Sequence, residues 1–195
     1  MCGIVAAVAD RNIVPVLIEG LRKLEYRGYD SAGLALINDA GLQRLRAVGR
    51  VAELAAQVDE TGAAGTTGIS HTRWATHGVP CERNAHPHIS GGLAVVHNGI
   101  IENHEVLRAR LRTEGYVFDS DTDTEVVAQL LTSYLERQWS PEKAMAEAME
   151  RLRGAFALVA LFSGRHDTLI GARRGSSLAV GYGEDEMYIG TDALA

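Results

Sequence analysis

Met1-Cys2-Gly3-Ile4-Val5 places a cysteine directly behind the initiator methionine, where an apolar, β-prone segment begins that continues to Val8. Removal of Met1 would leave Cys2 with a thiol nucleophile and a free α-amine of unperturbed pKa ~8, so one residue would supply both nucleophile and base. While Met1 stays attached, that nitrogen is an amide and the chain should be inactive. Cysteine is also a small core residue, and its position alone leaves that interpretation open.

The amino-acid composition limits which classes of protein this chain can belong to. The 195 residues are 46% hydrophobic and 23% charged, which is typical of one soluble globular domain with a sizeable core. Lys and Arg number 19 against 25 acidic residues, and this net charge of −6 argues against a nucleic-acid-binding surface. The two cysteines, Cys2 and Cys81, form no CxxC pair, and no secretory signal or membrane-length apolar run is present. These features favour a reduced, cytoplasmic setting.

Hydrophobic periodicity predicts alternating strands and helices. After the first strand, apolar residues recur at helical spacing from Ile13 to Leu24, and two β-prone runs flank the turn at 38–41. Further elements are expected as a short helix over 51–58, a loop over 62–68, strands over 69–72 and 93–97, an irregular piece over 73–92, helices over 102–114, 122–137 and 141–152, and β-prone runs starting near 155, 168, 178 and 187. Strands at both ends with helices between them predict a layered α/β arrangement with mostly antiparallel pairing.

Four separated stretches carry a family resemblance: residues 24–33 (LEYRGYDSAG), 71–78 (HTRWATHG), 97–104 (HNGIIENH) and 120–126 (SDTDTEV). Together with Cys2 they closely resemble the glutaminase domain of glucosamine-6-phosphate synthases. Those domains are class II glutamine amidotransferases of the N-terminal-nucleophile hydrolase superfamily. The similarity covers essentially the whole chain, in order.

The resemblance implies an α/β (α+β) fold, a four-layer αββα sandwich with mostly antiparallel sheets and the nucleophile at the start of a central strand. Residues 2–195 would form the glutaminase domain, ending short of the family's domain, and the isomerase region would be absent. The implied reaction is hydrolysis of L-glutamine to glutamate and ammonia without a cofactor. The ammonia would reach fructose 6-phosphate only on the missing region, and the full-length enzyme would be a homodimer.

Cleavage of an amide needs a nucleophile, a base and donors for the oxyanion. The resemblance gives the first two roles to Cys2, through a γ-glutamyl thioester, and the oxyanion hole to the side chain of Asn98 and the backbone N–H of Gly99. An Asn-Gly pair after a strand is more commonly a hairpin turn, which is the alternative here.

The α-carboxylate and α-ammonium of glutamine call for one cation and one anion. Arg73 and Asp123 fit these roles, since a guanidinium pairs well with a carboxylate and the family places an arginine there. Two alternatives stay open. Arg73 could be a surface residue, and Asp123 could belong to a helix start, because Thr122 and Glu125 form a capping-box pattern.

The long loop carries the remaining candidates. The resemblance suggests that Trp74, Thr76 and His77 belong to a lid that closes over glutamine, with His86 lining the same pocket. The alternative is a packing tryptophan with turn-stabilising polar neighbours. Arg27 and Asp30 are expected to brace the N-terminus rather than to react.

Other functions are less well supported. The seven histidines follow no recognised zinc spacing, neither cysteine pairs with another, and no phosphate-binding glycine motif is present. Metal and nucleotide cofactors are therefore not expected, and Cys81 is expected to be incidental. The competing hypotheses are the same domain from phosphoribosylpyrophosphate amidotransferase or asparagine synthetase, and a catalytically silent domain of the same fold.

Overall fold

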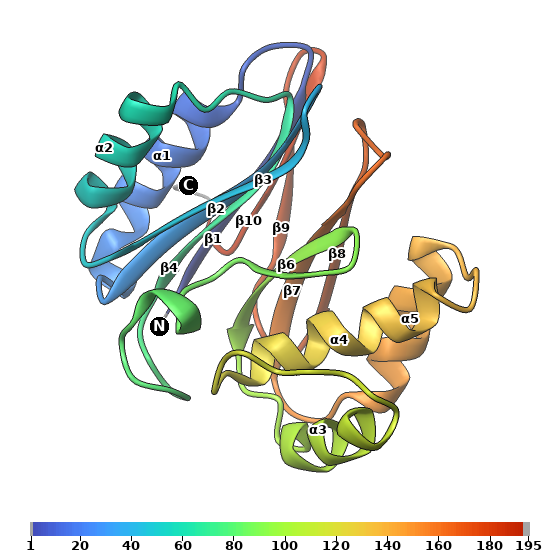
Figure 1. Cartoon of the computed structure of the whole chain (residues 1–195). Helices are drawn as coiled ribbons and strands as arrows, with labels where there is room; N and C mark the ends of the chain where they lie inside the picture. Colours follow the sequence, from blue (N-terminus) through green and yellow to red (C-terminus); the bar gives the residue numbers. More distant parts are fainter. Residues whose placement is uncertain (1, 193–195) are drawn as a thin grey trace.

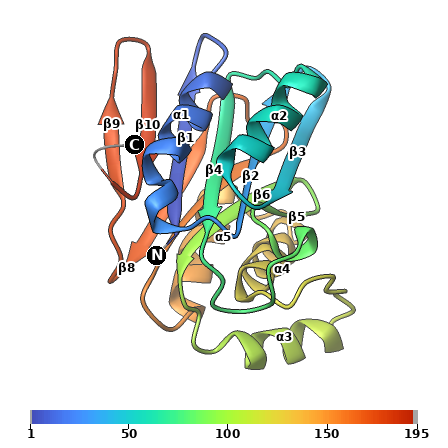
Figure 2. The ribbon, with the colours of Figure 1, turned by 90° about the vertical axis from the view of Figure 1, so that its left-hand side faces the viewer.

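Two antiparallel β-sheets pack face to face between two layers of helices (Figure 1), in a computed structural model that describes residues 2–192. Helices α1 (Val14–Leu24) and α2 (Val51–Thr61) cover the outer face of one sheet, and Figure 2 shows them in front of its strands. Helices α4 (Asp123–Leu135) and α5 (Pro141–Arg151) cover the outer face of the other, and α3 (His104–Thr113) packs beside α4. The predicted αββα sandwich is confirmed.

The larger sheet has the strand order β3-β2-β4-β1-β10-β9, and the smaller has the order β5-β6-β7-β8. The strands of the larger sheet are β1 (Gly3–Ala9), β2 (Ser31–Asn38), β3 (Gly41–Val48), β4 (Thr67–Arg73), β9 (Ala179–Tyr182) and β10 (Glu186–Gly190). Those of the smaller sheet are β5 (His88–Ser90), β6 (Leu93–Gly99), β7 (Phe156–Phe162) and β8 (Leu169–Arg174). Every pairing within the two sheets is antiparallel, as predicted.

Strand β1 is apolar on both faces because each face meets a different layer. Val5 and Ala7 pack in the core beneath α1 and α2, whereas Ile4 and Ala6 pack in the core between the two sheets. A strand buried on both sides reads as a continuous apolar run, which is the pattern from Ile4 to Val8. This double burial places Cys2 at the start of a strand near the centre of the molecule.

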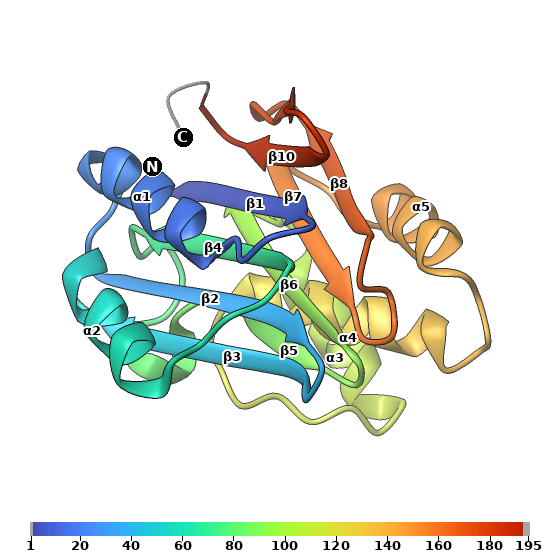
Figure 3. The same ribbon diagram turned by 90° about the horizontal axis from the view of Figure 1, so that it is seen from above.

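The pairing of β1 decides which residues surround Cys2. Strand β1 lies between β4 and β10, with Gly3 opposite Thr72, so the end of β4 and the loop after it run beside Cys2. Figure 3, from above, shows β1 and β4 lying across β6 of the second sheet. Two distant parts of the sequence therefore meet at the N-terminus.

The predicted elements are confirmed with small shifts of their ends, and two differences stand out. The segment 73–92, predicted to be irregular, contains a 3-10 turn (Glu82–Asn84) and the three-residue strand β5. A strand of that length is too short to show an alternating pattern. Thr67 and Gly68, predicted as loop, already belong to β4 because they pair with β1.

Candidate active site

Cys2 lies immediately before β1 and is half-buried. Its Sγ accepts a hydrogen bond from the backbone N–H of Trp74, with 3.3 Å between the two atoms. Burial raises the pKa of the thiol, and the Trp74 hydrogen bond acts in the opposite direction. A base close to the sulfur would therefore be needed to produce a thiolate near neutral pH.

Asn98 and Gly99 reach Cys2 from the second sheet, as the last two residues of β6. The Asn98 Nδ2 donates a hydrogen bond to the carbonyl oxygen of Cys2 at 2.8 Å. Gly99 has φ +114°, and a Cβ there would lie 2.1 Å from the Ala155 carbonyl oxygen, so no other residue fits. The hairpin-turn alternative is wrong, because both residues still pair with β7.

Arg73 ends β4 and is only 3% exposed, so the surface alternative is wrong. Its Nη2 donates to the carbonyl oxygens of His77 and, at 2.9 Å, of Gly78. Its Nη1 is buried 3.7 Å from Asp30 and makes no hydrogen bond to the described residues. The guanidinium holds the loop at one edge and retains one buried donor.

Asp123 is the first residue of α4 and 4% exposed. The helix-start interpretation is correct for its neighbour Thr122, whose side chain accepts the backbone N–H of Glu125 at 3.3 Å. The Asp123 Oδ2 accepts the backbone N–H of Ile101 at 2.9 Å. Its carboxylate also lies 3.7 Å from His97 Nδ1, so Asp123 faces the site as well as the helix.

The loop after β4 covers this group. Trp74 is 51% exposed and packs edge-on against Tyr29, with ring centroids 5.8 Å apart, so it is no core anchor. His77 packs in the same manner against His104 at 4.8 Å. Thr76 is exposed yet lines the hollow between the loop and Cys2, as do His77 and the buried His86.

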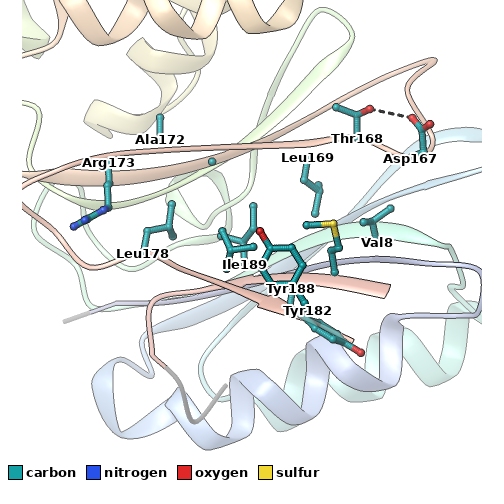
Figure 4. Close-up of a pocket in the computed structure, with 13 residues that line it drawn as sticks. Val8, Asp167, Thr168, Leu169, Ala172, Arg173, Leu178, Tyr182, Tyr188 and Ile189 are labelled. Carbon is teal, nitrogen blue, oxygen red and sulfur yellow. Dashed lines mark hydrogen bonds between the residues drawn. The ribbon is translucent and has the colours of Figure 1, made fainter. Parts of the chain in front are cut away.

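That hollow measures about 10 Å³, room for roughly one water molecule. The loop must therefore move before a substrate the size of an amino acid can reach Cys2. A much larger pocket of about 510 Å³ lies between β8 and β10 (Figure 4), but its lining is mainly aliphatic, as with Leu169, Leu178 and Ile189. Neither cysteine lines it, and it contains none of the predicted site residues.

The structure thus brings all nine predicted residues to one place, around the start of β1. Sequence reasoning missed His97 and Thr122, which also line the hollow, and His71, whose Nε2 lies 2.9 Å from Asn98 Oδ1. His71 and His97 stand within the quoted motifs, but nothing in a linear pattern shows which side chains of two sheets will touch.

Arg27 and Asp30 bind segments around the site and are not among the residues that line the hollow beside Cys2. Arg27 pairs with Asp192 and also donates to the Tyr26 hydroxyl at 3.1 Å. Asp30 accepts the backbone N–H of Ala75, at the base of the loop.

Within residues 2–192, no cluster of three potential metal ligands and no helix long and apolar enough to cross a membrane is found.

Comparison with known proteins identifies the family of this chain. A family model described as "Glutamine amidotransferase domain" matches residues 71–193. The whole chain is 53% identical to the glutamine–fructose-6-phosphate aminotransferase [isomerizing] of Brucella suis and 52% identical to that of Mesorhizobium japonicum. It spans 32% of the length of each of these curated relatives.

Among solved structures, a glutamine phosphoribosylpyrophosphate amidotransferase from B. subtilis matches with a TM-score of 0.84 and 25% identity, over 97% of this chain and 42% of that one. A class-II glutamine aminotransferase domain protein from Silicibacter pomeroyi shares the fold alone, with a TM-score of 0.64 and 17% identity over 97% of this chain and 88% of that one. With the family model matching most of a chain whose fold these structures share, this protein belongs to the glutamine amidotransferase domain family.

Proposed function

We propose that this chain hydrolyses L-glutamine to glutamate and ammonia through a γ-glutamyl thioester on Cys2, once Met1 has been removed. The observation that carries the proposal is the contact between Asn98 and Cys2, because it holds an amide N–H donor against the backbone of the residue that carries the thiol, at the start of a buried strand. A nucleophile flanked by such a donor is what acyl transfer requires.

In the first half of the reaction the Cys2 sulfur attacks the side-chain amide carbon of glutamine, and the carbonyl oxygen becomes an oxyanion. The second Nδ2 hydrogen of Asn98 and the N–H of Gly99 stabilise that charge. The freed α-amine of Cys2 takes the thiol proton and passes it to the departing nitrogen, so that the C–N bond breaks and ammonia leaves.

In the second half, water attacks the thioester carbon with the same amine as base. The C–S bond breaks, glutamate is released and the thiol regains its proton. The sum is glutamine plus water giving glutamate plus ammonia. Since burial raises the pKa of the Cys2 thiol, an adjacent amine is the appropriate base at neutral pH.

Recognition of glutamine rests on two buried groups of opposite charge. Arg73 offers to the α-carboxylate its Nη1, which lies near Asp30 but makes no hydrogen bond to the described residues, and Asp123 accepts hydrogen bonds from the α-ammonium. The small hollow supports a lid role for the loop that carries Trp74, Thr76 and His77, with His86 in the wall beneath it. Closure would keep water away from the thioester until ammonia has left.

For the longer protein we propose transfer of the ammonia to fructose 6-phosphate, giving glucosamine 6-phosphate. Identity of 52–53% along the whole chain to aminotransferases of that name supports this acceptor over phosphoribosylpyrophosphate, whose amidotransferase is 25% identical. Residues 2–195 would act as the glutaminase domain, and the transfer would require the region that this chain does not include. We further propose a homodimer for the full-length protein and a cytoplasmic location, which its two free cysteines support.

The test compares three purified chains whose N-termini are checked by mass spectrometry. Wild type without Met1 should release glutamate from glutamine, and Cys2→Ala should release none. Cys81→Ala is the matched control, since it removes the other free thiol and should behave as wild type. Equal glutamate release by wild type and Cys2→Ala would refute the proposal. Formation of glucosamine 6-phosphate by this chain alone would refute the proposal that ammonia transfer requires a further region.

A further inference from the structure

A buried line of side chains runs behind the oxyanion-hole residue Asn98 and connects both sheets to α4. It begins at His97 on β6, passes through Thr124 on α4 and His86 in the loop before β5, and reaches His71 on β4. His71 then contacts Asn98. Each member is at most 9% exposed, so water does not compete for these hydrogen bonds.

The direction of this line is fixed at the Asn98 end. The Cys2 carbonyl oxygen only accepts, so the Asn98 atom 2.8 Å from it is the nitrogen, and the amide oxygen faces His71. His71 Nε2 also lies 3.0 Å from the carbonyl oxygen of His97, a second pure acceptor. This Nε2 therefore carries the hydrogen and donates to both oxygens.

The remaining links follow from this assignment. Burial lowers the pKa of His71 to about 3, so the ring is neutral and its Nδ1 carries no hydrogen. His86 Nδ1, 3.1 Å away, must donate to it, which leaves His86 Nε2 to accept from the Thr124 hydroxyl at 2.5 Å. Thr124 in turn accepts from His97 Nδ1 at 3.0 Å.

The same assignment makes His97 Nε2, a buried ring nitrogen without a hydrogen-bond partner among the described residues, the end of the line. With the hydrogen on His97 Nδ1, its Nε2 is a bare acceptor, and it is the one ring nitrogen of the three histidines without a hydrogen-bond partner among residues 2–192. Reversing the line would set the bare His71 Nε2 against two carbonyl-type oxygens. Only one direction therefore satisfies every contact.

We propose that His71 is a positioning residue for the reaction: its Nε2–H holds the carboxamide of Asn98 in the orientation that turns the Nδ2 hydrogens toward Cys2. This inference rests on the proposed role of Asn98 as oxyanion donor. Without His71, the Asn98 amide can rotate and present its oxygen, which repels the oxyanion. His86, Thr124 and His97 keep the hydrogen of His71 on Nε2.

The test pairs His71→Met with His71→Gln, which have similar length but differ in the donor. His71→Met should lower kcat for glutamine hydrolysis about 10- to 100-fold with KM changed less than about threefold, because the oxyanion exists only beyond the ground state. His71→Gln, which keeps a donor near the Nε2 position, should return kcat to within about fivefold of wild type. Alkylation of Cys2 by iodoacetamide needs no oxyanion hole and should proceed at the wild-type rate in both.

Wild-type kcat in His71→Met, or an equal loss in both variants, would overturn the proposal. If His71→Met does not fold, Thr124→Val against Thr124→Ser makes the same comparison at the next hydroxyl, and the proposal requires that only the valine variant lose kcat. Imidazole ¹H–¹⁵N NMR of wild type at pH 7 should show His71 as the Nε2–H tautomer and His86 and His97 as Nδ1–H tautomers. Any other tautomer of His71 overturns the assignment, and this result does not depend on whether the chain hydrolyses glutamine. If wild type shows the expected tautomers but releases no glutamate, the proposed function is refuted instead.

Discussion

Mild acid should destabilise this protein through its buried histidines. His71, His86, His88 and His97 are all at most 5% exposed. Burial lowers the pKa of His71 to about 3, lowers those of His86 and His88 well below the usual 6.5, and also lowers that of His97. The folded protein therefore resists taking up protons that the unfolded chain accepts readily.

The sign follows from linkage. Because each folded-state pKa lies below the unfolded value of ~6.5, the contribution to stability is complete above that pH and is lost as the pH falls below it. At pH 5.5 about nine-tenths of unfolded imidazoles are protonated, which favours unfolding by about 1.4 kcal/mol for each one that stays neutral when folded. His71, His86 and His88 together give a loss of about 4 kcal/mol between pH 7.5 and 5.5, to which His97 adds up to about 1.4 kcal/mol. That is a large part of the ~5–15 kcal/mol by which domains are stable.

Urea denaturation at half-unit steps from pH 7.5 to 5.5 measures this loss before most carboxylates titrate. The control is His88→Gln, since His88 does not line the hollow beside Cys2, and glutamine can replace its hydrogen bond to Thr122 and keep a side chain beside the His86 ring, whose centroid lies 5.1 Å from that of His88. Its loss over the same interval should be smaller by about 1.4 kcal/mol. A wild-type loss below about 1.5 kcal/mol would refute the reasoning, because the histidines would then have to protonate within the folded protein.

Three further substitutions test the site. Gly99→Ala should lower the free energy of unfolding by about 2–5 kcal/mol in urea titrations, since it combines φ +114° with a contact 2.1 Å from the Ala155 carbonyl oxygen; a change under about 0.5 kcal/mol would contradict this. Asp123→Asn keeps an oxygen that accepts the Ile101 N–H but loses the negative charge that we propose binds the glutamine ammonium. Steady-state kinetics should therefore show KM at least about tenfold higher, at nearly unchanged stability. An unchanged KM would show that Asp123 does not bind glutamine. Arg73→Lys should raise KM about tenfold and speed proteolysis of the loop at 74–85, because an ammonium cannot replace the fork that holds the loop carbonyls; wild-type values of both would show that the fork is dispensable.

Local sequence pattern was sufficient for most of the elements. Leu17, Leu21 and Leu24 recur on one face of α1, and that face is fully buried against the larger sheet. The short strand β5 was not predicted, because its three residues, His88–Ser90, are too few to show an alternating pattern. It forms through pairing with β6. The Asn98-Gly99 pair was ambiguous for a similar reason, since turn propensity is local whereas its actual partner, β7, lies more than fifty residues away.

Sequence by itself determined which groups the chemistry can use: a cysteine one residue from the chain start, an Asn-Gly pair, and the candidates Arg73 and Asp123 within recognisable motifs. Tertiary structure alone decided how they act together. The register of β1 against β4 and the crossing of β6 set the distance between Cys2 and Asn98, and the packing of α4 on the second sheet brought Thr124 between two histidines. The physical reason is that a side chain's residue type sets what it can donate or accept, whereas burial and the neighbours fixed by long-range pairing set its charge, tautomer and direction.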